Sequence, residues 1–193
     1  MTVHVLPIWV KNPYNCPEVN TTLSSGMYRE LSPFILGPID TYLPGVQSQT
    51  FENLWQFSKV YFEYLYDGAI FWSWFAWRDA GWADKRAHRY PMGKGRKPVF
   101  SYWDGERLGY IEARKRIYAP IYARHVKMTD SYAQLAGLYS EGGEITLKDY
   151  DAYDHITMGM SLVNVINNPN RKMGHAFVLA MLLEDVLEGC LKQ

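Results

Sequence analysis

The alternation of apolar and polar positions is clearest in residues 51–66. Glu52, Gln56, Lys59 and Glu63 follow one another at intervals of four, three and four residues, which places them in a narrow arc of a helix. Nearly all other positions in this segment are bulky and apolar. A helix that is apolar over most of its circumference is normally buried. The pattern therefore predicts a buried helix over residues 51–66, capped by Ser48 or Thr50, whose polar stripe is either a solvent-facing edge or one wall of a ligand cleft.

The remaining segments predict several helices and a few short strands. Strands are expected at residues 2–10, where Pro7 indicates an edge or a bulge, and at 145–147, with an extended piece at 31–39. Loops are expected at 12–25 and 88–98 and a turn at 142–143. Helices are expected at 69–82, from 104–109 through 126 with Pro120 kinking or splitting it, at 131–139, at 154–165, and from Asn168-Pro169 to about 187. With no internal repeat or linker, this predicts one α+β domain over residues 1–193, predominantly helical.

Composition and charge narrow the possible classes of protein. The 193 residues include 20 basic and 20 acidic side chains, a balance that argues against binding driven by nucleic-acid phosphates. Cys16 and Cys190 form no C-x-x-C pair, which argues against a disulfide framework or structural zinc and favours a reducing compartment. The N-terminus lacks a signal-peptide pattern, and the most apolar stretch, residues 69–77, is too short to span a bilayer. We expect a soluble, cytoplasmic protein.

Four segments, in order, carry a resemblance to a known family. Glu52-x-x-x-Gln56-x-x-Lys59 with aromatic neighbours resembles the signature helix of the NADAR family of YbiA-like N-glycosidases. Upstream, Leu31-Ser-Pro-Phe34 is similar to the family's Leu-Ser-Asn-Phe segment. Downstream, residues 147–156 retain the acidic positions Asp149 and Asp154 of the family's Leu-Val-Glu…Tyr-Asp stretch, and residues 170–174 resemble its Asn-x-x-Gly helix start. The resemblance covers residues 27–187 and implies a NADAR-like domain.

The chain also departs from the family pattern. The Trp-Gly that follows the aspartate is replaced by Thr157-Met158-Gly159, so a stacking residue is missing there. Residues 72–109 match poorly apart from Trp103-Asp104. The chain therefore resembles a divergent branch, and the identity of the substrate does not follow from the resemblance.

The resemblance implies hydrolysis of an N-glycosidic bond in a phosphorylated ribosyl compound. Breaking a C1′–N bond builds positive charge on the sugar, which a carboxylate stabilises, and the departing nitrogen needs a proton. Glu52 and Asp154 are the candidate catalytic carboxylates, with their division of roles left open. Lys59 would position a phosphate or tune Glu52. The candidate substrate-binding residues are Gln56, Lys59, Trp55, Asp149, Lys94 and Arg96, of which Asp149 is also expected to be structural.

Other residues suggest weaker alternatives. Lys94 and Arg96 lie in a Gly-Lys-Gly-Arg-Lys loop, which is either a solvated basic loop or a phosphate-binding loop, although the P-loop motif is absent. Trp72, Trp74 and Trp77 are expected in the core rather than in a base-stacking platform. The histidines lack metal-ligand spacing, so neither a metal nor a cofactor is expected.

Three functions follow as hypotheses. The first is an N-glycosidase that removes ADP-ribose from a nucleobase or cleaves a ribosylaminopyrimidine phosphate. The second is a non-catalytic binder of ADP-ribose or a nucleotide on the same scaffold. The third is a nucleic-acid-associated protein that uses the tryptophans and the basic loop. The expected partners are accordingly phosphorylated ribosyl or ADP-ribosyl compounds, or ADP-ribosylated nucleic acid, and no membrane.

Overall fold

The computed structural model describes residues 1–192, which form two compact units. Unit 1 combines Met1–Ser32 with the chain from Arg114 onward, and unit 2 is the continuous segment Pro33–Ala113. The fold is α+β with 39% helix, 17% strand and several small sheets, which confirms the predicted class. Two compact units can belong to one domain, so the expectation of a single domain over residues 1–193 stays a prediction.

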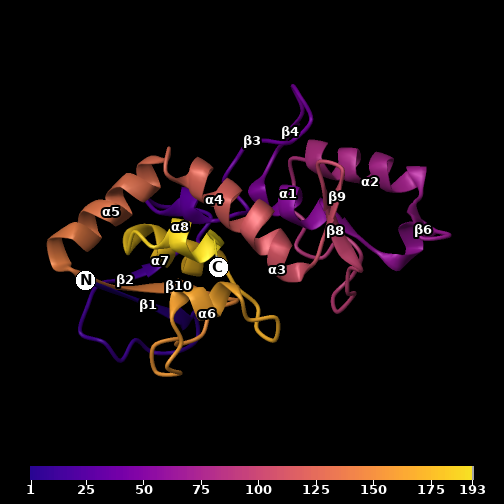
Figure 1. The fold of residues 1–193 in the computed structure, drawn as a ribbon. Coiled ribbons are helices and arrows are strands. Elements are labelled where there is room, and N and C mark those ends of the chain that lie inside the picture. The colour runs from indigo at the N-terminus through magenta and orange to yellow at the C-terminus, as the bar shows by residue number, and fades with distance from the viewer. Residues whose placement is uncertain (193) are drawn as a thin grey trace. The chain divides into compact units, whose positions relative to one another are not determined.

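A three-stranded parallel sheet lies in unit 1 (Figure 1). Its order is β1 (Thr2–Pro7), β10 (Glu144–Asp149) and β2 (Glu18–Asn20), so the strand from the C-terminal half is central. β1 is an edge strand, one of the two positions that Pro7 predicts, because a proline has no amide hydrogen for a ladder bond. The strand ends at Pro7, so the predicted extent to residue 10 is too long. The prediction of a loop throughout residues 12–25 is wrong at β2. This short strand forms by pairing with β10, which lies more than 120 residues later in the sequence.

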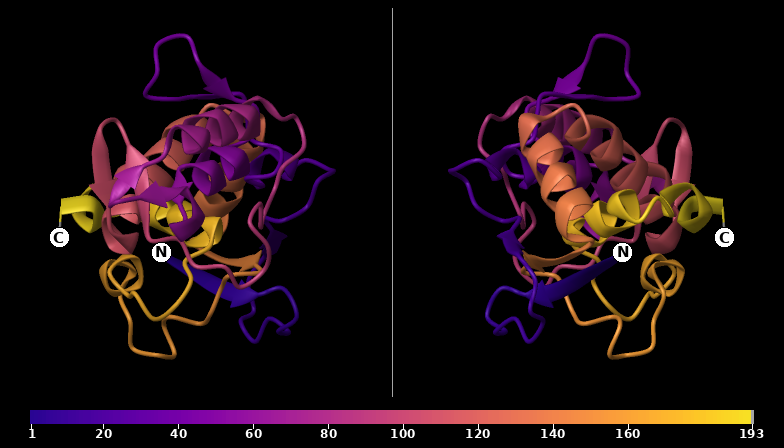
Figure 2. Two further views of the ribbon diagram at one scale, coloured as in Figure 1. Left: turned by 90° about the vertical axis from the view of Figure 1, so that its right-hand side faces the viewer. Right: turned by 90° about the vertical axis from the view of Figure 1, so that its left-hand side faces the viewer.

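Helix α7 (His175–Leu183) is the apolar core of unit 1. It is buried from His175 to Met181 and packs on β1, β10 and α4 (Ala119–Val126), as Figures 1 and 2 show. A helix was predicted here, but its predicted start at Asn168-Pro169 is wrong: the chain turns there, and Gly174 precedes the helix. The other helices described in unit 1 are η1 (Arg29–Leu31), η3 (Arg114–Tyr118), α5 (Asp130–Gly142), α6 (Leu162–Ile166) and α8 (Leu187–Lys192).

The boundaries of two other predicted helices also differ. Only α6 forms in residues 154–165, because Ser161 makes a capping box with Asn164 that starts the helix late. The segment 104–126 is not one helix. It begins with a hairpin turn at Asp104-Gly105, where both φ angles are positive, and continues through β9 (Glu106–Leu108), α3 (Tyr110–Ala113), the π-helical η3 (Arg114–Tyr118) and α4. Pro120 cannot donate an α-helical hydrogen bond to residue 116, which accounts for the wider turn before it.

Unit 2 is built on two packed helices, α1 (Phe51–Phe57) and α2 (Trp72–Ala83). Gly81 allows this packing, because a Cβ atom there would lie about 2 Å from ring atoms of Phe57. Three small antiparallel sheets complete the unit. They pair β3 (Ile39–Asp40) with β4 (Gln47–Ser48), β8 (Phe100–Trp103) with β5 (Lys59–Val60) and β9, and β6 (Leu65–Tyr66) with β7 (Ala69–Ile70).

The predicted helix over residues 51–66 is therefore too long. Ser58 caps it, and its Oγ donates to the carbonyl of Trp55, a bond that competes with helix continuation. Lys59 and Val60 instead pair with Ser101 and Phe100 of β8, a non-local contact that overrides the helical pattern. The extended piece expected at 31–39 is also only partly extended, since Leu31 closes η1 and residues 33–35 form a turn.

Among residues 1–192, no helix is both long enough and apolar enough to cross a membrane.

Candidate functional site

Helix α1 buries its polar side chains together with its apolar ones. Thr50 begins the helix by accepting a hydrogen bond from the amide of Asn53, as predicted for a cap. Every residue of α1 is buried, and Glu52 and Gln56 are only 6% and 9% exposed. The alternative of a solvent-facing edge is therefore wrong for these two residues.

The side chains of Glu52, Gln56 and Lys59 form one hydrogen-bonded series. Gln56 Nε2 donates to Glu52 Oε1 at 2.9 Å, and Lys59 Nζ donates to Gln56 Oε1 at 2.7 Å. The ammonium also lies 4.7 Å from the ring centroid of Trp55, a cation–π distance. The acceptor on one side and the donor on the other orient the Gln56 amide. We call Glu52, Trp55, Gln56 and Lys59 the α1 polar series.

The hydrogen bonds of the α1 polar series form even though the helix ends at Phe57, because Lys59 lies only two residues beyond that end. Lys59 is half-buried on β5, and its carbonyl accepts a hydrogen bond from the indole of Trp74. Glu63, the fourth member of the predicted stripe, lies instead in η2 (Phe62–Tyr64) and forms an ion pair with Arg96. The structure thus brings Glu52, Gln56 and Lys59 of the sequence motif together. Glu63, which belongs to the predicted stripe but not to the motif, has a different partner.

The basic loop of unit 2 is a loop, as predicted. Gly93 and Gly95 take positive φ angles of 95° and 88°, a conformation that glycine adopts without strain. Lys94 and Arg96 are exposed, and the pair between Arg96 and Glu63 ties the loop to η2. Binding of a substrate phosphate by Lys94 or Arg96 stays a prediction.

Asp149 lies at the end of β10 and is buried in unit 1. Its Oδ2 accepts a hydrogen bond from the amide of Ala176 at 3.2 Å and lies 3.0 Å from His175 Nδ1. Burial by itself raises the pKa of this carboxyl, but the charge and hydrogen bond of His175 and two backbone amides hold it below its usual value. A Cβ atom at Gly174 would lie 2.1 Å from Oδ2, so glycine is required there. Asp149 therefore caps the start of α7, which fits the structural role foreseen for it.

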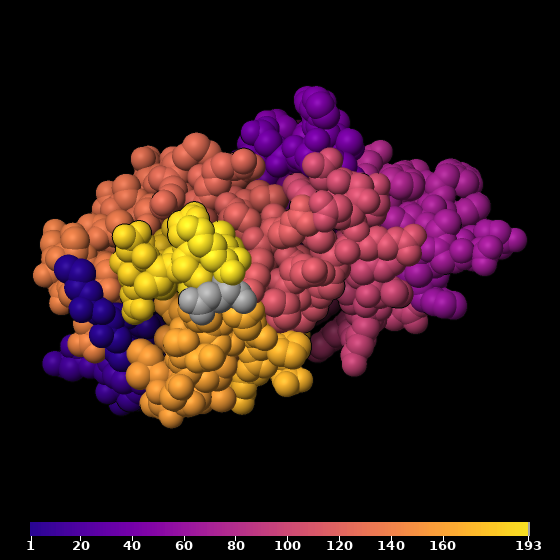
Figure 3. Space-filling model, viewed as in Figure 1, coloured from indigo at the N-terminus to yellow at the C-terminus, as the bar shows by residue number. Residues whose placement is uncertain are grey.

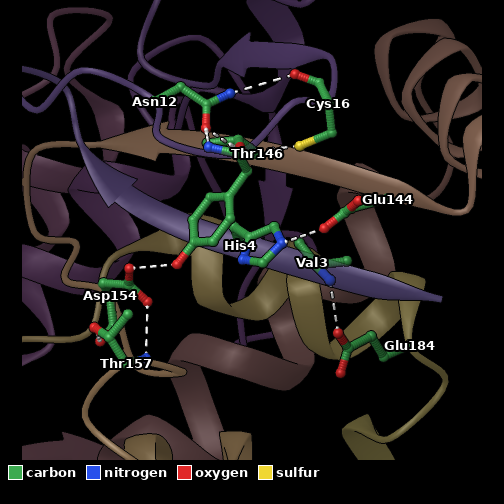
Figure 4. A network of polar contacts seen from close by, with 10 residues as sticks. Val3, His4, Asn12, Cys16, Glu144, Thr146, Asp154, Thr157 and Glu184 are labelled. Atoms are coloured by element: carbon green, nitrogen blue, oxygen red, sulfur yellow. Dashed lines mark hydrogen bonds and ion pairs between the residues drawn. The ribbon is translucent and has the colours of Figure 1, made fainter.

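Asp154 belongs to a second network in unit 1 (Figure 4). Tyr14 Oη donates to Asp154 Oδ2 at 2.6 Å, and the amide of Thr157 donates to Oδ1 at 3.1 Å. The hydrogen bond to Asp154, together with burial and nearby negative charge, raises the pKa of Tyr14 to about 12. The ring of Tyr14 stacks on His4 at 3.4 Å, and His4 Nε2 lies 2.7 Å from Glu144 Oε1.

Sequence reasoning did not find Tyr14 or His4. Tyr14 lies 140 residues before Asp154 in a segment without periodicity, so no local signal connects the two. It also did not anticipate the contact of His175 with Asp149, which depends on where β10 meets α7. His155, beside Asp154, is buried, and this burial lowers its pKa.

The tryptophans of α2 divide between core and surface. Trp74 is fully buried and Trp77 packs against Phe57 and Tyr64, whereas Trp72 is exposed. The prediction that all three lie in the core is therefore wrong for Trp72. Among residues 1–192, no cluster of three or more His, Cys, Asp or Glu side chains is suited to hold a metal ion.

Comparisons of the whole chain with protein-family models, with curated proteins and with solved structures find no match.

Proposed function

We propose that the chain is an N-glycosidase that hydrolyses the bond between a nitrogen and the ribosyl C1′ of a phosphorylated ribosyl compound, such as ADP-ribose attached to a nucleobase or a ribosylaminopyrimidine phosphate. The observation that carries the proposal is the α1 polar series. It places a buried carboxylate, an amide and an ammonium in one hydrogen-bonded row. The order of these residue types along the chain is that of the family signature.

The proposed chemistry follows from the burial of Glu52. Positive charge that develops on the sugar as the C1′–N bond breaks is stabilised more strongly by a carboxylate that is shielded from water than by an exposed one. Gln56 holds Glu52 Oε1 in one orientation through its Nε2–H, which keeps the carboxylate preorganised. In this proposal Lys59 meets a phosphate of the substrate. The catalytic role expected for Asp154 of unit 1, whose oxygens are oriented by Tyr14 and Thr157, stays a prediction.

A direct assay tests the proposal. The protein is incubated with DNA that carries ADP-ribosylated guanine and, separately, with a ribosylaminopyrimidine phosphate, and the release of ADP-ribose or ribose phosphate is followed by chromatography. We expect turnover on one substrate and a loss of kcat of about 100-fold or more in Glu52→Gln, the size of effect typical of a lost charge-stabilising group or general acid–base. Glu188→Gln is the control, because Glu188 is an exposed acidic residue of α8 in unit 1, outside the α1 polar series. Its kcat should stay within about twofold.

Two results would contradict the enzyme proposal. One is the absence of turnover on both substrates by a folded protein, and the other is unchanged turnover in Glu52→Gln. Because Glu52 is buried, circular dichroism and ADP-ribose binding by calorimetry establish that the variant is folded before its kcat is compared.

A second candidate function is non-catalytic binding of ADP-ribose or a nucleotide. Both carboxylate oxygens of Asp154 accept hydrogen bonds from within unit 1, an arrangement that suits a structural aspartate as well as a catalytic one. The replacement of the family's Trp-Gly by Thr157-Met158-Gly159 points the same way. Retained ADP-ribose binding without turnover on either substrate would favour this candidate.

A further inference from the structure

The β6–β7 hairpin of unit 2 and the residues on either side of it carry exposed large aromatic side chains. Phe62 is 78% exposed, Tyr66 is 74% exposed and Trp72 is 69% exposed, and Phe71, which lies 5.7 Å from Trp72 between ring centroids, is also exposed. The hairpin lies at the end of unit 2 where α2 begins (Figures 1 and 3). Four large exposed aromatic side chains within residues 62–72 indicate a binding surface.

The polypeptide around the hairpin is held by contacts of other groups. Tyr61 and Tyr64, which precede the hairpin, pack against Trp77 of α2 at 6.2 and 5.1 Å between ring centroids. The backbone is held by the pairing of β6 with β7 and by the amide of Phe71, which donates to the carbonyl of Tyr64. The turn residues Asp67 and Gly68 take the positive φ angles that a two-residue hairpin needs. None of these contacts uses the rings of Phe62, Tyr66 or Trp72.

Two arginines from other segments contact the hairpin and η2. Arg107 of β9 donates to the carbonyl of Gly68 at 2.6 Å, and its guanidinium lies 4.8 Å from the ring centroid of Phe100. Arg96 forms its ion pair with Glu63, the residue after Phe62. Arg107 thus brings a cation to the hairpin turn, and the pair of Arg96 with Glu63 holds the basic loop to the helical turn that contains Phe62.

The segment that supplies Arg96 is strongly basic. Residues 85–97 contain six basic side chains and no acidic one, although unit 2 as a whole has nine of each. The basic residues are Lys85, Arg86, Arg89, Lys94, Arg96 and Lys97. The net charge of the chain is zero, but residues 85–97 form a local positive segment. The ion pair of Arg96 with Glu63 fixes the loop of this segment to η2, which contains Phe62.

We propose that the exposed surface around the β6–β7 hairpin, formed by Phe62, Tyr66, Phe71 and Trp72 with Arg107 and the basic loop, binds single-stranded nucleic acid. Every base has a flat face that stacks on an aromatic ring, and the backbone supplies a phosphate charge at each nucleotide. Exposed rings interspersed with cations match both features. The inference does not depend on the proposed hydrolase activity.

Fluorescence anisotropy with labelled, unmodified oligonucleotides tests this inference. The full-length protein is titrated into a 12-mer of dT, a 12-mer of rU and a 12-base-pair duplex at 50 and 200 mM salt. We expect binding to at least one single strand, tighter than to the duplex and weaker at the higher salt concentration. The two single strands distinguish a DNA ligand from an RNA ligand.

Matched variants locate the binding surface. Trp72→Ala should weaken single-strand binding about tenfold, the typical effect of losing one stacking ring. Trp9→Ala is the control, because Trp9 is equally exposed, at 69%, but belongs to unit 1. Arg107→Gln should lower the slope of log affinity against log salt by about 0.7, the value for one phosphate contact with a single strand. Lys127→Gln, an exposed cation of unit 1, should leave the slope unchanged.

Several outcomes would overturn the inference. They are no binding to either single strand, equal losses in Trp72→Ala and Trp9→Ala, or binding to vesicles of phosphatidylcholine and phosphatidylserine but not to oligonucleotides. Concentration-dependent self-association that is abolished by Trp72→Ala, without oligonucleotide binding, would instead assign the surface to a second copy of the chain. Failure of oligonucleotide binding leaves the hydrolase assay unaffected, since that assay includes a small-molecule substrate.

Discussion

Asp149 and His175 show how this chain accommodates charge in its interior. His175 Nε2 lies 2.9 Å from the carbonyl of Thr21, and its Nδ1 faces the Asp149 carboxylate. Both ring nitrogens face acceptors, so a protonated imidazole satisfies both contacts. An ion pair of this kind adds little net stability compared with apolar residues, but the loss of one partner leaves a buried charge uncompensated.

Asp149→Asn should therefore destabilise the fold by about 3–5 kcal/mol at pH 7, measured by urea unfolding. The control is Asp151→Asn, since Asp151 pairs at 3.6 Å with the exposed Lys172 and such pairs contribute about 1 kcal/mol or less.

The same residue predicts a pH dependence. The pKa of Asp149 is lower in the folded protein than its usual value of about 3.9, so the ionised carboxylate stabilises the fold above about pH 4. This stabilisation is lost as the pH falls through the folded-state pKa. The difference in unfolding free energy between wild type and Asp149→Asn should thus shrink below about pH 4, and a difference that is constant from pH 7 to pH 3 would contradict the assignment.

At the scale of elements, close contacts decide where helices lie and where they end. The ring of Phe57 in α1 rests on the backbone of α2 at Gly81, where it occupies the position that a side chain would need. Gly137 in the middle of α5 has no atom within 4 Å of the corresponding position. The two glycines have the same helical setting and different surroundings.

Substitution by alanine should therefore change the stability of the protein in opposite directions at the two glycines. Gly137→Ala should stabilise the protein by about 1 kcal/mol, because alanine is the better helix former and the site is open. Gly81→Ala should destabilise it by about 1–3 kcal/mol or more, because the overpacking outweighs the gain in helix propensity. Thermal unfolding of the two variants beside the wild type measures both effects. Stabilisation by both substitutions would show that α1 and α2 do not pack as described.

At the scale of the whole molecule, the two cysteines report on folding. Cys190 of α8 is fully buried, and this burial raises the pKa of its thiol, whereas Cys16 is partly exposed. Both are free thiols.

Ellman's reagent should therefore detect one readily reacting thiol in the native protein and two in denaturant. Reaction of Cys190 requires opening of α8, so its rate should rise with urea, while the rate of Cys16 changes little. Cys16→Ser identifies the fast thiol. Two thiols that react equally fast in the native state would show that α8 is not docked in unit 1.

The sequence predicted those features that depend on neighbouring residues. The α+β class, the Thr50 cap, the apolar helix α7 and the basic loop all follow from propensity or composition over a few residues. The link between Glu52, Gln56 and Lys59 also belongs here, because their short spacing brings the side chains together even though the helix ends at Phe57.

Only the tertiary structure decided the features that depend on distant pairing. The end of α1 is determined by β5 and β8, the existence of β2 by β10, and the contacts of Asp149 and Asp154 by His175 and Tyr14. The exposure of a side chain also depends on distant segments. Trp72 and Trp74 lie two residues apart in the same apolar stretch, yet Trp72 is exposed and Trp74 is buried. Periodicity describes which side chains share a face of an element. Which faces are then covered depends on segments that meet only after the chain has folded, because long-range packing outweighs the small local preferences.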